Sequence, residues 1–222
     1  MKNVVLFGIG QFSETVSAYL ALDPDITIVG YTVDATYQGD VTEFLGKPVI
    51  PWEQLETRFP PQDVLLFGPI SFRDGNRFRR DRFLDGKARG YRFLTYIHPD
   101  ASIMTDQIGE NCLILEKCIL QPCARIGDNV IIWSANHIGH HSRIDDHCFI
   151  AGQVAISGSC HVQELTFFGG QSGLSDNCTV GAGCIIGFGA AILTDLAADS
   201  VVMRADNRVI DNAARRFAKR LL

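Results

Sequence analysis

A repeat of six residues runs through the second half of the chain and constrains its fold more than any other feature. Every sixth residue from position 108 through position 192 is large and apolar, and the register never slips. Four places after each of them stands a small or β-branched residue, with the exception of Asn136. A helix of period 3.6 or a strand of period 2 cannot sustain this pattern over such a length. A parallel β-helix can, because each side of a triangular coil sends one large and one small side chain inward.

Three such sides make a coil of eighteen residues, so the repeat predicts about five coils, roughly 24 Å tall at ~4.8 Å per strand. Residues 97–103 predict the start of the coils, and residues 193–202 predict a final partial coil. Glycine follows the large residue at several positions, where we expect the chain to turn a corner and a side chain to be costly. These glycines are Gly109, Gly127, Gly139, Gly169, Gly181 and Gly187.

Composition limits the cellular compartments and the binding partners that we expect for this protein. The 222 residues carry a net charge of -5 without an evident basic face, which argues against a general polyanion binder. No apolar run approaches the ~20 residues of a membrane span, and the N-terminal residues lead directly into a strand and a glycine turn without a secretory signal. We therefore expect a cytoplasmic protein that binds neither nucleic acid nor a membrane.

Cysteine usage agrees with that compartment. No CxxC pair occurs among the seven cysteines, and six of them stand at the small inward position of the coil. We expect these six to be core thiols that pack as small hydrophobic side chains. They are Cys112, Cys118, Cys148, Cys160, Cys178 and Cys184.

Residues 1–96 predict an α/β domain. Residues 3–7 form an apolar run that leads into Gly8, Gly10 and a helical stretch to about residue 20, and a second apolar run ends at Asp34. Strand, glycine turn, helix, strand and acid are the opening of a Rossmann-like nucleotide-binding unit. Ser13 stands where the fingerprint has its third glycine. Nucleotide contact by Gly8, Gly10 and Asp34 and an ordinary α/β turn therefore both stay open.

We assign residues 97–209 to the β-helix domain. Two basic segments flank this domain. In residues 71–90, Asn76, Arg77 and Arg80 stand near the start of an expected helix. They form either a phosphate or sugar site built from Arg forks or a solvated basic face. Residues 210–222 alternate apolar and basic side chains at helical spacing, which predicts a helix that caps the open end of the coils.

Histidines gather in one stretch of the repeats, at His137, His140, His141 and His147. Such a cluster on the outer surface of a rigid coil is hard to attribute to packing. Acyl transfer from coenzyme A and zinc-dependent carbonic anhydration are both known on this fold. The zinc enzymes use a His-x4-His pair and a third histidine about two coils away. No two histidines of this chain are five apart, which makes zinc the weaker alternative.

The order of parts, an α/β domain followed by hexapeptide repeats, resembles bacterial sugar acyltransferases. These are typified by sialic acid O-acetyltransferases and UDP-4-amino-sugar N-acetyltransferases, and the resemblance covers nearly the whole chain. It implies a left-handed β-helix, acetyl-CoA as co-substrate, no metal, and acetylation of an amine or hydroxyl of a nucleotide-linked sugar in surface-polysaccharide or lipopolysaccharide biosynthesis. A zinc lyase of the γ-carbonic-anhydrase type and a non-catalytic nucleotide-sugar-binding protein are the alternatives.

The resemblance also implies a catalytic base. In the family, this base is a histidine two places after a large inward residue, which matches His140 after Ile138. An acidic residue often follows that histidine, where this chain has His141, so Asp145 or Asp146 could orient the base instead.

Further site residues follow from the resemblance and the coil. One coil beyond His140 is Gly158, where a family glycine polarises the thioester oxygen through its N–H; we expect the two residues to stack. Gly170 and Phe188 match contacts to coenzyme A, with Arg204 available to its phosphates. We expect Asn136, His137 and His141 to contact the acceptor sugar. An internal hydrogen bond to a neighbouring coil is the alternative for Asn136.

A homotrimer is the expected assembly. Large apolar residues on the outer faces of the coils are too numerous for solvent, namely Ile131, Trp133, Phe149 and Phe167. Hexapeptide acyltransferases pair such faces around a threefold axis.

Overall fold

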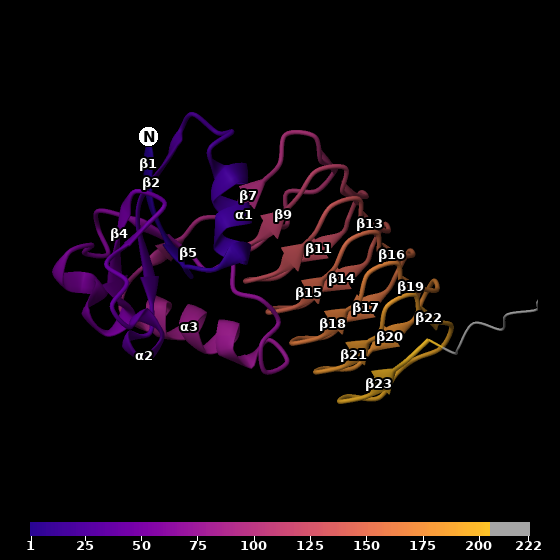
Figure 1. Cartoon of the computed structure of the whole chain (residues 1–222). Helices are drawn as coiled ribbons and strands as arrows, with labels where there is room; N and C mark the ends of the chain where they lie inside the picture. The colour runs from indigo at the N-terminus through magenta and orange to yellow at the C-terminus, as the bar shows by residue number, and fades with distance from the viewer. Residues whose placement is uncertain (205–222) are drawn as a thin grey trace, which may run out of the picture.

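Short parallel strands stack into a triangular β-solenoid that lies beside an N-terminal α/β unit (Figure 1). The computed structural model describes residues 1–204. The capping helix expected at 210–222 lies outside the described residues.

Three parallel sheets form the faces of the solenoid. The first face contains β7 (Tyr96–Ile97), β9 (Leu113–Ile114), β12 (Ile131–Ile132), β15 (Phe149–Ile150), β18 (Phe167–Phe168), β21 (Ile185–Ile186) and β23 (Val201–Val202). The second contains β8 (Ser102–Ile103), β10 (Ile119–Leu120), β13 (His137–Ile138), β16 (Ala155–Ile156), β19 (Gly173–Leu174) and β22 (Ala191–Ile192). The third contains β11 (Arg125–Ile126), β14 (Arg143–Ile144), β17 (His161–Val162) and β20 (Thr179–Val180).

Strand pairing confirms the coil of eighteen residues. His137 pairs with Ala155, and Arg143 pairs with His161. The large residues of the repeat stack inside the solenoid, and the six cysteines expected there are all buried. Residues eighteen apart therefore occupy equivalent positions in successive coils. Since β7 already belongs to the first face, the coils begin at Tyr96, one residue before the expected boundary.

The corners differ in detail from expectation. From position 108 through position 186, the residue three places after each large residue has a positive φ, as in Asn111, Ala135 and His141, and this is where the chain turns. The glycines directly after the large residue serve close approach instead. A Cβ at Gly139, for example, would lie 2.4 Å from the carbonyl carbon of Ser157 in the next coil. A side chain is costly there, as predicted, but because of the neighbouring coil.

The N-terminal unit is a six-stranded sheet in the order β3-β4-β2-β1-β5-β6. Its strands are β1 (Lys2–Phe7), β2 (Ile26–Val33), β3 (Glu43–Phe44), β4 (Lys47–Pro51), β5 (Leu65–Phe67) and β6 (Arg92–Phe93), of which β3 is antiparallel to its neighbour. The helices are α1 (Gln11–Leu20), α2 (Ala35–Gln38), α3 (Arg77–Ala88) and the 3₁₀ turn η1 (Trp52–Thr57). Within residues 1–204, no helix is long and apolar enough to span a membrane.

Aromatic side chains join this unit to the first face of the solenoid. Ile131 and Phe149 are 1% and 4% exposed and share one apolar cluster with Val4, Leu6 and α1. The Phe72 ring lies 4.3 Å from that of Phe167. The apolar residues that we expected at a threefold axis are therefore covered largely by the chain's own N-terminal unit, and they do not argue for a trimer.

A buried arginine forms a second junction. The Arg79 guanidinium on α3 is 1% exposed and donates to the carbonyl oxygens of Asn129, His147 and Cys148. Asn76, at the N-terminal end of α3, accepts a hydrogen bond from Arg79 and donates to the carbonyl oxygen of Leu165. Part of the basic segment 71–90 thus docks α3 onto the coils, a role that neither interpretation of the sequence included.

Candidate functional site

The glycine turn after β1 opens into a pocket of about 350 Å³, here called the glycine-turn pocket. Gly8 has a φ of +124°, and a Cβ there would lie 2.2 Å from Ser13 Oγ. Ser13 is buried against this glycine, in the position where the fingerprint has its third glycine. The pocket is lined by Phe7, Gly8, Ile9, Gly10, Phe12, Ser13, Val33, Asp34, Tyr37, Pro69, Ile70, Ser71, Arg73 and Phe78.

The structure thus brings Gly8, Gly10 and Asp34 together, as the sequence pattern predicts. Asp34 is 7% exposed, and both of its carboxylate oxygens accept hydrogen bonds from Arg82, at 2.8 and 3.0 Å. This bidentate pair fixes the carboxylate at the wall of the pocket. A hydrogen bond that Asp34 accepts from a ribose hydroxyl stays a prediction, and the ribose would share the carboxylate with Arg82.

Sequence reasoning missed the cationic and aromatic wall of this pocket. The Arg73 guanidinium lies 4.8 Å from the centre of the Tyr37 ring and 5.1 Å from that of Phe78. Arg82 stacks over Phe78 as well, at 5.1 Å. A guanidinium over an aromatic ring is a suitable surface for an anionic, partly aromatic ligand. The alternating Phe and Arg residues of segment 71–90 were the available signal.

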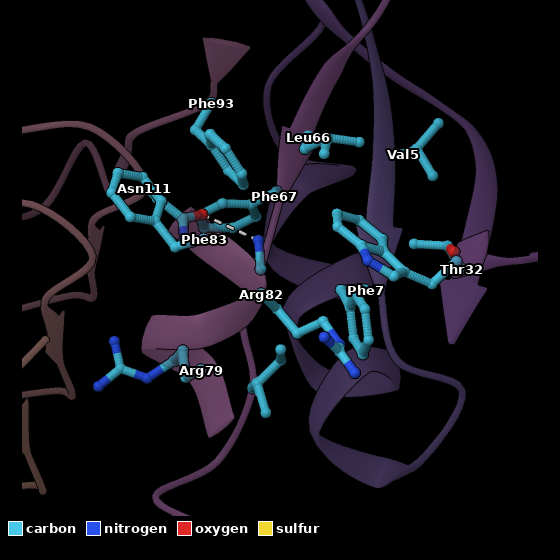
Figure 2. Close-up of a pocket in the computed structure, with 13 residues that line it drawn as sticks. Val5, Phe7, Thr32, Leu66, Phe67, Arg79, Arg82, Phe83, Phe93 and Asn111 are labelled. Carbon is cyan, nitrogen blue, oxygen red and sulfur yellow. Dashed lines mark hydrogen bonds between the residues drawn. The ribbon is translucent and has the colours of Figure 1, made fainter. Parts of the chain in front are cut away.

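A smaller cavity of about 10 Å³ lies between the sheet and α3 and holds one water at most. Figure 2 shows its wall of aromatic and aliphatic side chains, with the side chains of Arg79 and Arg82 diverging. Asn111 accepts a hydrogen bond from Gly68 N–H across it, at 2.8 Å. This cavity belongs to the core and has no room for a substrate.

His140 lies exposed at the corner that follows β13. A Cβ built on Gly158 would lie 2.6 Å from His140 Cε1 and 2.7 Å from Nε2. The imidazole therefore covers Gly158, one coil further on, and the expected stacking of these two residues is present. Only a glycine leaves room for the ring in this position.

His141 contacts the same imidazole. The two Nδ1 atoms of His140 and His141 are 3.2 Å apart, and the rings cross at 81°. One ring must donate and the other accept, so a proton on His140 Nδ1 leaves its Nε2 with a free lone pair. His141 thus stands where an acid would orient the base.

The two aspartates considered as orienting groups are engaged elsewhere. Asp145 accepts hydrogen bonds from Arg143 Nε at 2.5 Å and from His161 Nε2 at 2.8 Å. Asp146 Oδ1 accepts the N–H of Asp128 at 2.8 Å. Neither is positioned to orient His140, so this alternative is wrong.

The amide of Gly158 also has a partner. Its N–H donates to Asp176 Oδ1 at 2.9 Å. The same contact recurs on another corner, where Asp128 and Asp146 each accept an amide one coil earlier. A carboxylate on this rung is a repeated structural device, and the role of the Gly158 amide as an oxyanion donor stays a prediction that requires Asp176 to release it.

The two remaining histidines of the cluster, His137 and His147, lie in different environments. His147 is 5% exposed, its Nδ1 lies 2.9 Å from Asn129 Nδ2, and its ring meets Phe83. Burial and the nearby Arg79 charge lower the pKa of His147 to about 4. It is a neutral core histidine. His137 lies half-buried on the second face, in register with Ala155.

Asn136 has the internal role that was its alternative. Its side chain is 1% exposed, donates to the carbonyl oxygen of Trp133 at 2.5 Å and accepts the N–H of Val154 at 2.7 Å. A side chain held in this way inside the coil cannot reach a bound sugar, so the expected sugar contact of Asn136 is wrong.

A groove of about 300 Å³ runs along the corner between the first and second faces. This corner groove is lined by Trp133, Ser134, Ala135, Gly152, Gln153, Gln171 and Phe188. A Cβ at Gly170 would lie 3.2 Å from Gly152 O and 3.6 Å from the Phe188 ring, and one at Gly189 would lie 3.0 Å from Arg204 Nη1. Gly170, Phe188 and Arg204 therefore gather at one place, as expected.

His140 stands on a different corner. Gly152, Gly170 and Phe188 follow strands of the first face, whereas His140 and Gly158 follow strands of the second. The two sets of residues thus border opposite edges of the second face. One chain does not bring the expected base and the expected coenzyme contacts together.

Metal ligands do not gather in the described part of the chain. Among residues 1–204, no group of three or more His, Cys, Asp or Glu side chains is placed to hold a metal ion.

No family model matches the sequence, and no curated protein matches it. Solved structures do. The acetyltransferase domain of PglB from Neisseria gonorrhoeae FA1090 in complex with acetyl coenzyme A is 25% identical, with a TM-score of 0.74, covering 89% of this chain and 93% of that one. PerB from Caulobacter crescentus in complex with CoA and GDP-perosamine is 24% identical, with a TM-score of 0.76 and coverages of 90% and 93%.

A third structure, WeeI from Acinetobacter baumannii AYE, is 18% identical, with a TM-score of 0.78, and covers 95% of this chain and 100% of that one. The likeness extends over both the N-terminal unit and the solenoid, as coverage of this extent requires. The chain therefore has the fold of hexapeptide-repeat, left-handed β-helix sugar N-acetyltransferases.

Proposed function

We propose that the protein transfers an acetyl group from acetyl-CoA to an amine, or a hydroxyl, of a nucleotide-linked sugar in bacterial glycan biosynthesis. The observation that carries this proposal is the His140 imidazole over Gly158, in a chain that also has a separate glycine-turn pocket. Neighbours with the same fold support it, since PerB was solved with CoA and GDP-perosamine and PglB with acetyl coenzyme A.

His140 is the general base in this mechanism. Its Nε2 takes the proton from the acceptor nitrogen or oxygen as that atom attacks the carbonyl carbon of the thioester. The carbon–sulfur bond of the tetrahedral intermediate then breaks, and the proton passes from His140 to the departing sulfur. In this mechanism His140 Nδ1–H donates to His141 Nδ1, 3.2 Å away, which keeps Nε2 of His140 available. No metal and no covalent enzyme intermediate are required.

The developing oxyanion needs a donor close to the base. Gly158 lies beneath the imidazole, but its N–H donates to Asp176 in the next coil. Acetyl-CoA that places its carbonyl oxygen there would displace the exposed Asp176 carboxylate into water. Removing the Asp176 carboxylate should free the Gly158 N–H and so favour binding of the thioester. Removing a catalytic acid would have the opposite effect and slow the reaction.

A homotrimer supplies the missing half of the site. The expected contacts to coenzyme A lie in the corner groove, across the second face from His140. A second copy that packs its corner groove against this His140 would assemble base, thioester and acceptor at one interface. The N-terminal unit covers the early coils of the first face, where Leu113, Ile131 and Phe149 are buried. The second and third faces, with the exposed far end of the first, are therefore those available to such copies.

The Rossmann-like N-terminal unit holds the nucleotide of the acceptor. Gly8 and Gly10 lead into the N-terminus of α1, which suits a diphosphate, and Arg73 adds a cation at the same wall. Tyr37 and Phe78 offer rings to the base. His137, on the open second face, is the proposed contact of the base-bearing copy with the sugar.

One experiment tests the proposal directly. Purified protein is incubated with acetyl-CoA and a panel of UDP- and GDP-linked amino sugars, and product masses are read by mass spectrometry. Transfer adds one acetyl group to one member of the panel. Binding of a nucleotide sugar without turnover supports the sensor instead, and stoichiometric zinc in an active hydratase supports the lyase.

A further inference from the structure

Trp133 lies between the two hollows of the chain. It directly follows β12, is half-buried, and its indole centre is 5.4 Å from the Phe12 ring at 56°. Phe12 lines the glycine-turn pocket, and Trp133 lines the corner groove. The pocket and the groove therefore meet at this pair of rings.

The Phe12 and Trp133 rings stand beside the place where a ligand would be anchored in the pocket. Phe12 belongs to the first turn of α1, directly after the glycine turn. A diphosphate at that turn would carry its attached sugar past Phe12, toward Trp133 and the groove in which we place the thioester. This step rests on the proposed function.

The lining of the groove fits a neutral sugar ring. Beside Trp133 it offers Ser134, Gln153 and Gln171, which donate and accept hydrogen bonds without charge. No acidic or basic side chain is among its lining residues within the described part of the chain. An aromatic face with a few neutral polar groups suits a pyranose, whose C–H face is apolar and whose rim carries hydroxyls.

We infer that Trp133 is a specificity-determining residue of the acetyl transfer, and that the sugar ring of the acceptor rests on its indole. The nucleotide then supplies affinity in the glycine-turn pocket, and contact with Trp133 selects for the correct attached sugar. Exchanging Trp133 should alter recognition of the sugar while recognition of the nucleotide persists.

Binding separates these contributions without any turnover. The probes are GDP with GDP-perosamine, and UDP with a UDP-linked 4-amino sugar, titrated by calorimetry. Trp133→Leu should weaken binding of the nucleotide sugar by about tenfold, which corresponds to ~1.4 kcal/mol, and leave binding of the matching nucleoside diphosphate within about twofold. Leu193→Ala, at an exposed apolar residue that lines neither the pocket nor the groove, should leave both affinities unchanged.

Fluorescence supplies a second reading on the unmutated protein. The chain has two tryptophans, and Trp52 is 4% exposed with its Nε1 donating to Asp85 at 2.6 Å. A change in emission on adding the nucleotide sugar, absent with the nucleoside diphosphate and absent in Trp133→Phe, places the sugar at Trp133. The Phe variant keeps an aromatic ring and guards against a loss of folding.

The outcomes distinguish a failure of the role inferred for Trp133 from a failure of the proposed function. Equal loss of nucleotide and nucleotide-sugar binding in Trp133→Leu, or unchanged binding of both, overturns the role of Trp133 and leaves acetyl transfer in place. Failure of the wild-type protein to bind or acetylate any nucleotide sugar of the panel overturns the proposed function and this inference with it.

Discussion

At the scale of single residues, the corner at His140 carries the strongest prediction. His140→Ala should lower kcat by about 10²–10⁴-fold, because general base catalysis is typically worth that much, while acetyl-CoA binding survives. His141→Ala should cost less, since it removes the group that orients the base rather than the base itself. Steady-state kinetics with the best acceptor of the panel measure both.

His137→Ala is the matched control from the same stretch of the coil. It should raise the KM for the sugar nucleotide more than it lowers kcat. A His140→Ala enzyme with near-normal kcat, beside an inactive His137→Ala or His141→Ala, would mean that the base is misassigned within the cluster.

His147 predicts a dependence of stability on pH. Its pKa is lowered from the ordinary 6.5 to about 4 by burial, so between these values the unfolded chain binds a proton that the folded protein does not. The free energy of unfolding should therefore fall as the pH drops from about 6.5 toward 4, by up to about 3 kcal/mol from this residue. Urea unfolding of wild type and His147→Asn at pH 7.5 and pH 5 measures it.

The Asn variant should lose that part of the pH dependence. It should also be less stable at pH 7.5, because Asn129 loses its partner. Parallel pH curves for the two proteins would contradict the assignment of His147 as a neutral core residue.

Residue roles were predictable from the sequence where the repeat determines them. The inward position of the cysteines and the stacking of His140 on Gly158 follow from counting by six and eighteen. The repeat could not reveal that Asp176 occupies the Gly158 amide, or that His147 faces Asn129, because these depend on side-chain rotamers. Asn136 broke the pattern in the sequence, and the structure explains this by its two hydrogen bonds inside the coil.

At the scale of elements, α3 is the joint between the two halves of the chain. Arg79 is buried, its partners described above are neutral oxygens, and burial lowers the pKa of its guanidinium to about 10, so it remains charged at neutral pH. Arg79→Met should lower the free energy of unfolding by about 2–4 kcal/mol, since several carbonyl oxygens lose their donor in a buried place. Chemical denaturation monitored by circular dichroism measures the change.

The neighbouring arginine is the natural control. Arg80 pairs with Asp81 at the surface, at 2.9 Å, so Arg80→Met should change the stability by less than about 1 kcal/mol. A similar loss in both variants would mean that α3 is held by its apolar contacts and not by the buried guanidinium.

At the scale of the whole molecule, the separation of the two corners makes a prediction about assembly. His140→Ala has no base, and Gly170→Glu blocks the corner groove with a charge that repels the phosphates of coenzyme A. Each homotrimer should be inactive. Mixed trimers regain one intact site, which pairs the His140 of one copy with the groove of another, so random 1:1 mixing should restore about a quarter of the wild-type activity.

Light scattering on each variant alone provides the control, since both should remain trimers at micromolar concentration. A monomer would rule out the assembly. Trimers whose mixture stays inactive would indicate that the base and the groove act within one chain.

The two-part architecture was predictable from the sequence because the repeat and the glycine turn are local signals. The way in which the parts meet was not. Phe149 was taken for an exposed residue of a trimer face, because the pattern of the coil states only that it points outward. What covers an outward side chain depends on contacts such as Phe72 with Phe149, which no local spacing encodes.

The buried Arg79 also has a consequence for synthesis of the chain. Its acceptors on Asn129, His147 and Cys148 are made 50 to 69 residues after it. At the 5–20 residues per second typical of translation, about 3–14 seconds separate Arg79 from Cys148. During that interval α3 has no surface on which to dock, so the N-terminal unit emerges from the ribosome with its apolar junction open and completes its packing only after the middle coils have formed.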